Sequence, residues 1–466
     1  MVATLPFGKK VAYACGMLGW SMLSGIYMVT LVYYYEPPEG QGLVSLIPDM
    51  TLWGWLSLLA LIMAAGRAFD AVTDPLIAQF TDQSKNPNGR RIPIMRWTFL
   101  PTAVFSGLMY LPWVEGPEMV NVYWLGFTQF GFFLCMTLYN VPYNALLPEL
   151  GHSSREKLEL ATMQGVMLIL GLVLAAAYLQ LADVLESVLN LEKRIRAIQY
   201  SIWIYCGISA ISLAIPAFAI SEKKYCVSKP NSMDFRKALR DTFSNRHFKF
   251  FLVADFSYFT AMSIIYASLL YYVTVLLGQE ESFGTIIVGI MIAGSLIYLI
   301  PIGGQSLLSR LTGRFGKKRL IMFSFFALTV MMGVVTGLGM YPIDEKIQGY
   351  ILGIGTCLPL AIMSILPTTL LAEISDLDSK QTGQQKEGMY FGVRNFLQKV
   401  GQMFGMVAIA LLIKLGKDPG DDLGIRLTAV VGIALCIAAA CIFFFFNETR
   451  LNKAIDEVED RRLPES

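Results

Sequence analysis

Charged residues are scarce in this chain, and their scarcity indicates its class. Only 15% of the 466 residues are charged, whereas 55% are hydrophobic and the mean hydropathy is +0.54. Soluble proteins contain about 25% charged residues. The net charge of +2 gives no basis for nucleic-acid binding, so we expect no nucleic-acid partner. The composition predicts an integral membrane protein with many spans.

Residues that carry enzyme chemistry are also few. The chain has two His and seven Cys, the Cys are scattered, and no Cys-x-x-Cys pair occurs. The sequence contains no phosphate-binding glycine loop and no cluster of metal ligands. We therefore expect that the protein is not an enzyme and that it binds no cofactor.

Apolar runs long enough to cross about 30 Å of hydrocarbon recur along the whole chain. We predict twelve, at residues 11–35, 52–78, 97–114, 119–147, 160–182, 200–220, 249–277, 284–308, 319–340, 347–372, 388–413 and 425–447. The predicted fold class is therefore an all-α membrane protein with twelve transmembrane helices. An even number of spans places both termini on the same side of the membrane.

The positions of the 37 Lys and Arg residues indicate which side that is. Most of them lie at the two termini and in the connections that share the termini's side. Cytoplasmic loops carry the excess of positive charge. We therefore predict an inner (cell) membrane protein with both termini in the cytoplasm. Away from the span ends, the basic residues within the spans are Arg67, Arg394 and Lys399.

The connection at residues 221–248 is the longest on the cytoplasmic side and divides the chain into two sets of six spans. We expect an N-terminal bundle at 1–220, a C-terminal bundle at 249–449 and a cytoplasmic tail at 450–466.

Apolar residues in the connector repeat at helical spacing, at Phe235, Leu239 and Phe243, with basic residues between them. This pattern predicts an amphipathic helix on the surface of membrane lipid. The two sets of spans also contain similar basic turns, Gly89-Arg90-Arg91 and Gly316-Lys317-Lys318, each after the second span of its set. The similarity of the two turns indicates two six-helix pseudo-repeats.

Three charges lie inside the second span, at Arg67, Asp70 and Asp74. A charge at the bilayer centre costs about 2.5–3.5 kcal/mol. At 100° per residue the three positions fall within about 60° of arc and so share one helix face. One Arg cannot neutralise two carboxylates, so we predict a monovalent cation site at the aspartates, with Pro75 freeing backbone carbonyls for the ion. The alternative is an internal Arg–Asp pair that only stabilises packing.

Polar residues on the fourth span form a stripe at Gln129, Thr137, Asn140 and Asn144. At 1.5 Å per residue, Asn140 lies roughly 12 Å and Thr137 roughly 17 Å from the cytoplasmic edge, near the midplane of a ~30 Å core. We predict that Asn140, Asn144 and Gln129 bind the solute, together with the ring of Tyr27. Alternatively, Gln129 and Asn144 only hydrogen-bond neighbouring helices.

The eleventh span carries the other two intramembrane cations. Lys399 lies roughly 17 Å from the cytoplasmic edge and is expected to point into a cavity. Arg394, about 9 Å from that edge, is expected to act as a gate or to contact lipid headgroups. Asp255, at a similar depth in the seventh span, is either a third intramembrane acid or extends to the surface. The paired glycines Gly388/Gly392 and Gly401/Gly405 indicate close helix packing.

These motifs resemble the glycoside–pentoside–hexuronide:cation symporters of the major facilitator superfamily. The resemblance rests on Arg67-x-x-Asp70-x-x-x-Asp74-Pro75, on Asn140-Val141-Pro142-Tyr143 and on Glu387-Gly388-Met389-Tyr390-Phe391. It implies that Asp70 and Asp74 bind the coupling cation, with Thr73 and Thr137 as further oxygen ligands. It also implies that Lys399 couples the two halves, and we expect Arg67 and Arg394 to take part in coupling or gating.

The chain departs from the family at the residues that hold the sugar. The family's acidic positions on the first and fourth spans correspond to Ser21 and Asn140, and its Arg on the fifth span is replaced near Met163 or Gln164. A small polyhydroxy solute such as a sugar or glycoside, bound by neutral groups, is the favoured interpretation. The alternative is a sodium-dependent lysophospholipid or amphiphile transporter, and a channel is less favoured.

The predicted mechanism is cation-coupled symport by alternating access. The expected coupling ion is Na⁺, Li⁺ or H⁺, and the expected partners are a small solute, a monovalent cation and membrane lipid. We expect a monomer.

Overall fold

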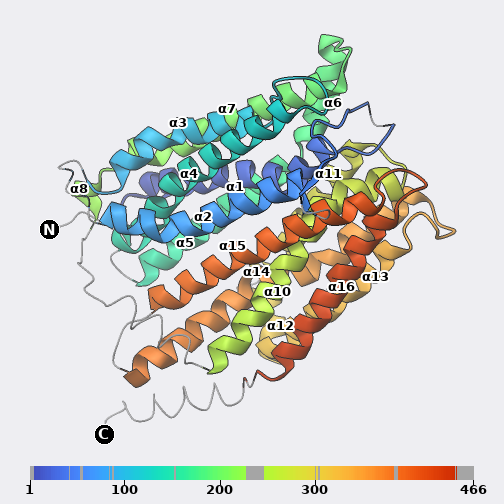
Figure 1. Ribbon diagram of the computed structural model, residues 1–466. Helices are drawn as coiled ribbons and strands as arrows, with labels where there is room; N and C mark the ends of the chain where they lie inside the picture. Colours follow the sequence, from blue (N-terminus) through green and yellow to red (C-terminus); the bar gives the residue numbers. More distant parts are fainter. Residues whose placement is uncertain are drawn as a thin grey trace, which may run out of the picture. The chain divides into compact units, whose positions relative to one another are not determined.

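The computed structural model describes residues 5–448 except 41, 53–55, 83, 85, 87–88, 152–153, 227–245, 300, 303–304, 383–386 and 447. Nearly all of the described residues are helical (Figure 1). The helices are α1 (Phe7–Tyr35), α2 (Leu58–Asp82), α3 (Ile92–Leu108), α4 (Met119–Leu150), α5 (Ser154–Ala175), α6 (Tyr178–Leu189), α7 (Arg194–Ala219), α8 (Glu222–Tyr225), α10 (Arg246–Tyr271), η1 (Tyr272–Leu276), α11 (Glu281–Ile297), α12 (Leu307–Phe315), α13 (Lys317–Thr336), α14 (Glu345–Thr382), α15 (Glu387–Leu412), η2 (Ile413–Leu415) and α16 (Leu423–Phe444).

Four strands of two residues each form two antiparallel pairs. In the first pair, β1 (Thr51–Leu52) lies against β2 (Leu56–Ser57). In the second, β3 (Pro301–Ile302) lies against β4 (Gln305–Ser306).

Nine helices in the described part of the chain are long and apolar enough to cross a membrane. They coincide with nine of the twelve predicted spans. The other three predicted spans, at 52–78, 97–114 and 284–308, coincide with α2, α3 and α11, which are also helical. The arrangement is consistent with twelve transmembrane helices.

Several predicted span boundaries differ from the helix ends, and two of the differences have a clear local cause. The second span begins at Leu58 rather than at residue 52, because the Ser57 hydroxyl accepts a hydrogen bond from the Ala60 N–H at 3.1 Å and caps the helix. The eighth ends at Ile297 rather than at residue 308, shortly before Pro301, which has no N–H to continue a helix.

The chain divides into two compact units. Unit 1 comprises residues 1–230, 266–289 and 406–425, and unit 2 comprises residues 231–265, 290–405 and 426–466. The predicted bundles at 1–220 and 249–449 stay predictions.

Helix packing in unit 1 centres on α1, which packs against α5 and α7, while α4 packs against α2 and α3 (Figure 1). The tyrosines Tyr13 and Tyr143 join α1 to α4. Each hydroxyl donates to the other residue's backbone carbonyl, at 3.0 and 2.9 Å, and the rings stack at 4.7 Å. These bonds satisfy two hydroxyl groups that burial would otherwise leave without partners.

Packing in unit 2 confirms part of the glycine prediction. A Cβ on Gly401 would lie 3.0 Å from the Phe256 carbonyl oxygen, and one on Gly405 would lie 2.7 Å from the Thr260 carbonyl oxygen. These glycines therefore allow α15 to approach α10 closely. The prediction was wrong for Gly392, where a Cβ would meet no described atom within 4 Å.

The two basic turns have the same construction. The Glu222 carboxylate accepts the backbone N–H groups of Arg90 and Arg91 at 2.8 and 3.0 Å. The Glu448 carboxylate accepts those of Lys317 and Lys318, both at 3.0 Å. Each carboxylate follows the sixth span of its set and satisfies N–H groups at a helix start.

Each of these turns begins with a glycine at positive φ, +117° at Gly89 and +83° at Gly316. Only glycine adopts such a conformation readily. A Cβ on Gly89 would also lie 2.3 Å from a Glu222 carboxylate oxygen. The similarity of the predicted turns therefore extends to backbone conformation and to the group that caps them.

Some predictions fall on residues outside the described set. They are the amphipathic helix with Phe235, Leu239 and Phe243, and the tail at 450–466.

Candidate functional site

Helix α2 carries the charged face that the sequence predicts. Arg67 and Asp70 are both buried, with 8% and 4% of their surface exposed. One guanidinium nitrogen of Arg67 lies 3.7 Å from an Asp70 carboxylate oxygen, across one helical turn. This separation exceeds that of a charge-assisted hydrogen bond, so the pair is loose.

A short hydrogen bond to the Asp70 carboxylate comes from α4. The Thr137 hydroxyl donates to Asp70 Oδ1 at 2.9 Å, and Thr137 is also buried. The structure therefore brings together two of the four predicted cation ligands, from helices that pack against each other.

The other two predicted ligands lie on the next turn of α2. Asp74 is half-buried, and α2 continues through Pro75 to Asp82. The Thr73 hydroxyl donates to the Phe69 carbonyl at 2.9 Å and to the Asp70 carbonyl at 3.1 Å, so its hydrogen points back along the helix. Its oxygen keeps lone pairs that can reach an ion.

Two aromatic rings cover the Arg67 guanidinium. Its carbon lies 4.8 Å from the centre of the Tyr27 ring and 5.0 Å from that of Phe133. Such contacts stabilise a cation through the ring quadrupole. Arg67 Nε has no hydrogen-bond partner among the described residues, so much of the contact of this cation is with ring faces.

Sequence reasoning singled out Tyr27 as a surface for the solute and missed Phe133. Tyr27 is buried and its ring faces Arg67. Phe133 could have been found, because it precedes Thr137 by four residues and therefore lies on the same face of α4.

The remaining polar residues of α4 separate into two groups. Gln129 is fully buried, and its amide donates to the Ile62 carbonyl at 3.2 Å. A Cβ on Gly66 would lie 1.8 Å from that amide nitrogen, so Gln129 fills the space above this glycine. These contacts favour the alternative in which Gln129 holds α4 to α2.

Further along α4 and on α5, three amides form a chain. The Asn144 amide donates to Asn140 Oδ1 at 2.9 Å, and the Gln164 amide donates to Asn144 Oδ1 at 3.1 Å. Asn140 is half-buried and Asn144 is exposed. Such amides keep further donor and acceptor capacity for a polar solute.

A second buried ion pair lies in unit 2 and was not predicted as a pair. Arg394 on α15 donates to both carboxylate oxygens of Asp255 on α10, at 2.9 and 3.1 Å, and to the Thr368 hydroxyl on α14 at 2.9 Å. Arg394 and Asp255 are 6% and 4% exposed. The signal was their opposite charge at similar depth.

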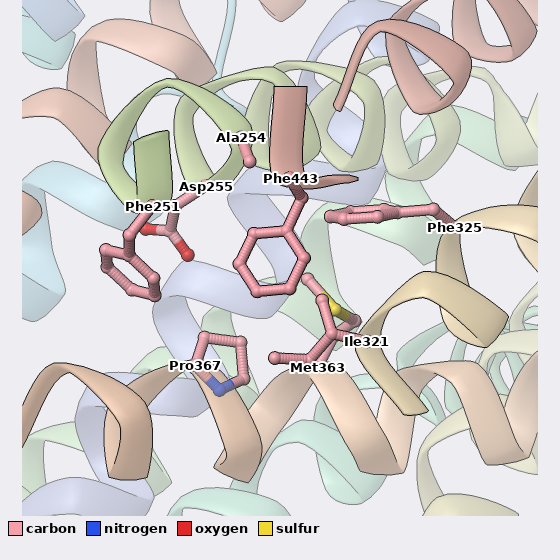
Figure 2. Close-up of a pocket in the computed structure, with 8 residues that line it drawn as sticks. All are labelled: Phe251, Ala254, Asp255, Ile321, Phe325, Met363, Pro367 and Phe443. Atoms are coloured by element: carbon pink, nitrogen blue, oxygen red, sulfur yellow. The ribbon is translucent and has the colours of Figure 1, made fainter. Parts of the chain in front are cut away.

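The surroundings of this pair are apolar. The Phe251 ring lies 5.7 Å from the Arg394 guanidinium carbon. A small hollow beside Asp255 is lined by Phe251, Phe325, Phe443 and Pro367 (Figure 2). Lys399 is half-buried further along α15.

The comparisons with known proteins agree with this architecture. A family model described as MFS/sugar transport protein matches residues 12–450. An uncharacterised symporter of Synechocystis sp. is 23% identical, over 95% of this chain and 93% of its own. The glucuronide carrier protein homolog of Escherichia coli is 21% identical, over 97% and 95%.

A third relative is the sodium-dependent lysophosphatidylcholine symporter 1 of Xenopus tropicalis. It is 22% identical, over 68% of this chain and 64% of its own. Among solved structures, the nucleoside transporter NupG aligns with a TM-score of 0.61 and 11% identity, over 94% of this chain and 99% of its own. This likeness shows the fold.

The fold and the family match together define an all-α integral membrane transporter of the major facilitator superfamily, which is not an enzyme. The chain belongs to the MFS/sugar transport family and, within it, to the glycoside–pentoside–hexuronide:cation symporters. The predicted fold class and family are confirmed. The roles predicted for the individual site residues stay predictions.

Proposed function

We propose that the protein is a symporter of the inner (cell) membrane that couples a monovalent cation to a small polyhydroxy solute. The observation that carries the proposal is the environment of Asp70, a buried carboxylate bonded to Thr137 and loosely paired with Arg67. Asp74 lies one turn further along the same helix. Oxygen ligands of this kind suit a hard cation.

The mechanism follows from charge. A cation that binds beside Asp70 and Asp74 offsets their negative charge and lowers the cost of burying them. Solute binds near the amide chain on α4 and α5. The filled site then favours the conformation that opens to the other side, to the extent that the ligands bind that conformation more tightly.

The test is solute accumulation in proteoliposomes with an imposed ion gradient. Asp70→Asn and Asp74→Asn should each abolish cation-driven accumulation in a protein that still folds, as judged by gel filtration and thermal unfolding. We expect a Na⁺ or Li⁺ gradient to drive uptake in the unmodified protein. Uphill uptake that persists in both variants would refute the cation site, and uptake that follows only the pH gradient would identify a proton site.

A sugar or glycoside is the solute class that the contacts favour. The amide chain Asn140–Asn144–Gln164 offers neutral donors and acceptors that match hydroxyl groups. The rival, a lysophospholipid, is supported by the similarity to the lysophosphatidylcholine symporter. It needs a cation for its phosphate, and Arg394 already gives its donors to Asp255 and Thr368.

A binding screen separates the two classes. Purified protein in sodium buffer is tested by thermal shift against monosaccharides, disaccharides, uronates and lysophospholipids. Stabilisation by sugars or uronates that is lost in Asn140→Ala would support the favoured class. Stabilisation by lysophospholipid alone, unchanged in Asn140→Ala, would establish the rival.

A further inference from the structure

Two segments from the second half of the sequence belong to unit 1. They are residues 266–289 and 406–425, which contain the end of α10, the start of α11, the end of α15 and the start of α16. The distribution of Lys and Arg predicts that the loops here face away from the cytoplasm. Two cations, Lys414 and Arg194, join these segments to the first 230 residues.

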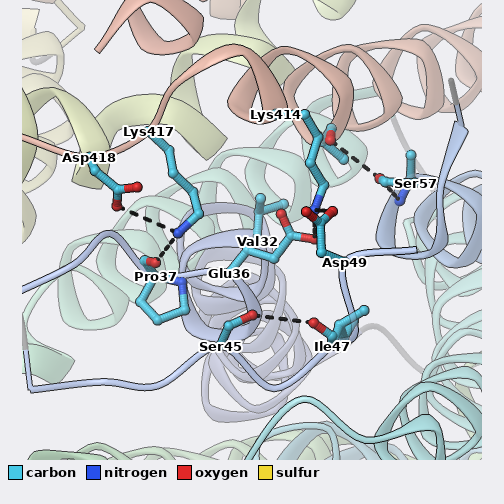
Figure 3. A network of polar contacts seen from close by, with 12 residues as sticks. Val32, Glu36, Pro37, Ser45, Ile47, Asp49, Ser57, Lys414, Lys417 and Asp418 are labelled. Carbon is cyan, nitrogen blue, oxygen red and sulfur yellow. Dashed lines mark hydrogen bonds and ion pairs between the residues drawn. The ribbon is translucent and has the colours of Figure 1, made fainter. Parts of the chain in front are cut away.

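Lys414 contacts two carboxylates of the first half (Figure 3). Its Nζ lies 2.8 Å from Asp49 Oδ1 and 3.3 Å from Glu36 Oε1. The two acids differ in exposure, because the Asp49 side chain is 81% exposed and the Glu36 side chain only 2%. Glu36 Oε2 has no hydrogen-bond partner within the described part of the chain. Glu36 is thus the buried and incompletely paired member.

Other contacts between the same two stretches do not involve the Glu36 carboxylate. Lys417 Nζ donates to the Pro37 carbonyl at 2.5 Å (Figure 3). The Glu39 N–H donates to Asp418 Oδ1 at 2.7 Å. The Tyr271 hydroxyl donates to the Glu36 carbonyl at 2.6 Å. We call these contacts, together with those of Lys414, the outer joint.

Arg194 makes a second, similar connection. Its guanidinium lies 2.7 Å from Asp183, 2.7 Å from Glu186 and 3.5 Å from Glu281 of α11. Glu281 is 4% exposed. Gln180 adds hydrogen bonds to the Ser282 carbonyl and the Thr285 hydroxyl at 2.7 and 2.8 Å. In both places one cation contacts more than one acid, and at least one of these acids belongs to the other half of the sequence.

We propose that Glu36 is a proton-binding residue that controls the outer joint: the joint is held when Glu36 is protonated or paired with Lys414, and is released when Glu36 is ionised without that partner. The proposal rests on the transport function only in requiring that the joint opens, since alternating access requires contacts on each face to break in turn. It does not depend on which solute or coupling ion is carried.

The electrostatic balance at Glu36 gives the direction of the pH effect. Burial of the Glu36 carboxyl raises its pKa, and so does the nearby negative charge of Asp49. The positive charges of Lys414 and Lys417 lower it, but the net effect is a raised pKa. The hydroxyl of Tyr271 faces the Glu36 backbone and not its carboxylate. An exposed Glu has a pKa of about 4.3. The closed joint therefore binds the proton more tightly than an open one, and the stability that protonation gives to it is lost as pH rises.

Removing Lys414 should make this dependence stronger. Without its main cation, an ionised Glu36 is a buried charge with little compensation. The variant Lys414→Met should therefore open the joint at neutral pH and close it again at acid pH. Adding Glu36→Gln removes the buried negative charge, so the joint of the double variant should stay closed at both neutral and acid pH.

The experiment is hydrogen–deuterium exchange of the purified full-length protein, read on peptides that cover residues 36–50 and 406–420. Each variant is compared with the unmodified protein at the same pH, about 7 or about 5, so that the intrinsic pH dependence of exchange cancels. The matched control is Lys193→Met, which removes an exposed cation that pairs with Glu115 and makes none of the contacts of the outer joint. We expect at least a fivefold faster exchange in Lys414→Met at neutral pH, a smaller difference at acid pH, and less than twofold in the control.

The outcomes separate this proposal from the transport function. Wild-type exchange in Lys414→Met at neutral pH, or an increase that is equal at both pH values, would overturn the role of Glu36. If Lys414→Met exchanges faster throughout the chain, the single variant Glu36→Gln tests the proposal instead. It should exchange no faster than the unmodified protein in the peptides that cover residues 36–50 and 406–420. Faster exchange there would also refute the proposal. None of these readouts requires transport.

Discussion

The two units each contain a buried Arg beside an Asp, a Thr hydroxyl and an aromatic ring, yet the two sites are built differently. In unit 2, Arg394 holds Asp255 with two hydrogen bonds of 2.9 and 3.1 Å. In unit 1, Arg67 approaches Asp70 with a single nitrogen at 3.7 Å. There the short bond to the carboxylate comes from Thr137, at 2.9 Å.

The difference in geometry supports the proposal that the unit 1 pair, and not the unit 2 pair, lies at the cation site. A bidentate Arg–carboxylate pair neutralises both charges and fixes their geometry. Asp255 and Arg394 therefore join α10 to α15 within unit 2. In unit 1 the Arg67–Asp70 contact is longer, and the Thr137 hydroxyl makes a short hydrogen bond to the Asp70 carboxylate. The same residue types thus form a bidentate ion pair in one unit and a longer contact in the other, where we propose the cation site.

The largest expected effect is a loss of stability in a variant that breaks the tight Asp255–Arg394 pair. Arg394→Met leaves Asp255 buried without its partner, which costs about 3–5 kcal/mol. Arg67→Met should cost much less, because Asp70 keeps the Thr137 hydrogen bond. Thermal unfolding of the purified variants, followed by intrinsic fluorescence, should therefore give a clearly lower Tm for Arg394→Met than for Arg67→Met.

A double variant is the control for this comparison. Arg394→Met combined with Asp255→Leu removes both charges and should recover most of the lost Tm, since an apolar replacement of a buried pair is often neutral. Equal destabilisation by Arg67→Met and Arg394→Met would show that the two pairs do not differ as their geometry indicates.

The sequence predicted much of this architecture because hydrophobic length and charge placement are local signals. The spans follow from the length of the apolar runs, the basic turns from short local sequences, and the charged face of α2 from the helical period of 3.6 residues. The Asp70–Thr137 contact was also anticipated, though only through the family resemblance, since nothing in either helix alone says that they pack together.

What the sequence did not predict depends on contacts between distant helices. Asp255 and Arg394 are separated by more than a hundred residues, so their opposite charges at similar depth did not by themselves establish that α10 and α15 pack together. The Tyr27 ring was assigned to the solute because it lies deep in the first span, and its contact with Arg67 was not predicted because Arg67 lies on a different helix. Likewise, the local sequence around Glu36 gave no indication that Glu36 is buried beside Lys414, which lies far away in the sequence.

A second, smaller effect is expected at the threonine that contacts the ion pair in each unit. Thr137→Val removes the hydroxyl that donates to Asp70 and keeps the shape of the side chain. A hydrogen bond to a charged group is worth about 1.5–3 kcal/mol, so we expect the apparent affinity for the coupling cation to change by about tenfold or more. Thr368→Val is the matched variant in unit 2 and should leave that affinity unchanged, because Arg394 keeps both bonds to Asp255. The measurement is the cation dependence of initial uptake in proteoliposomes, and equal effects of the two variants would contradict the comparison.

The smallest expected effect concerns the rings that face the two arginines. Phe133→Leu removes one of the two aromatic faces at Arg67, a contact worth about 0.5–2 kcal/mol. Arg67 Nε has no hydrogen-bond partner among the described residues, so loss of this ring contact should let the guanidinium move relative to Asp70. Phe251→Leu removes the ring at 5.7 Å from Arg394, whose position is fixed by two bonds to Asp255. We therefore expect a few-fold change in apparent cation affinity for Phe133→Leu and none for Phe251→Leu, measured in the same uptake assay. A change in cation affinity for Phe251→Leu that matches that of Phe133→Leu would show that the ring contacts act through general packing and not through the position of Arg67.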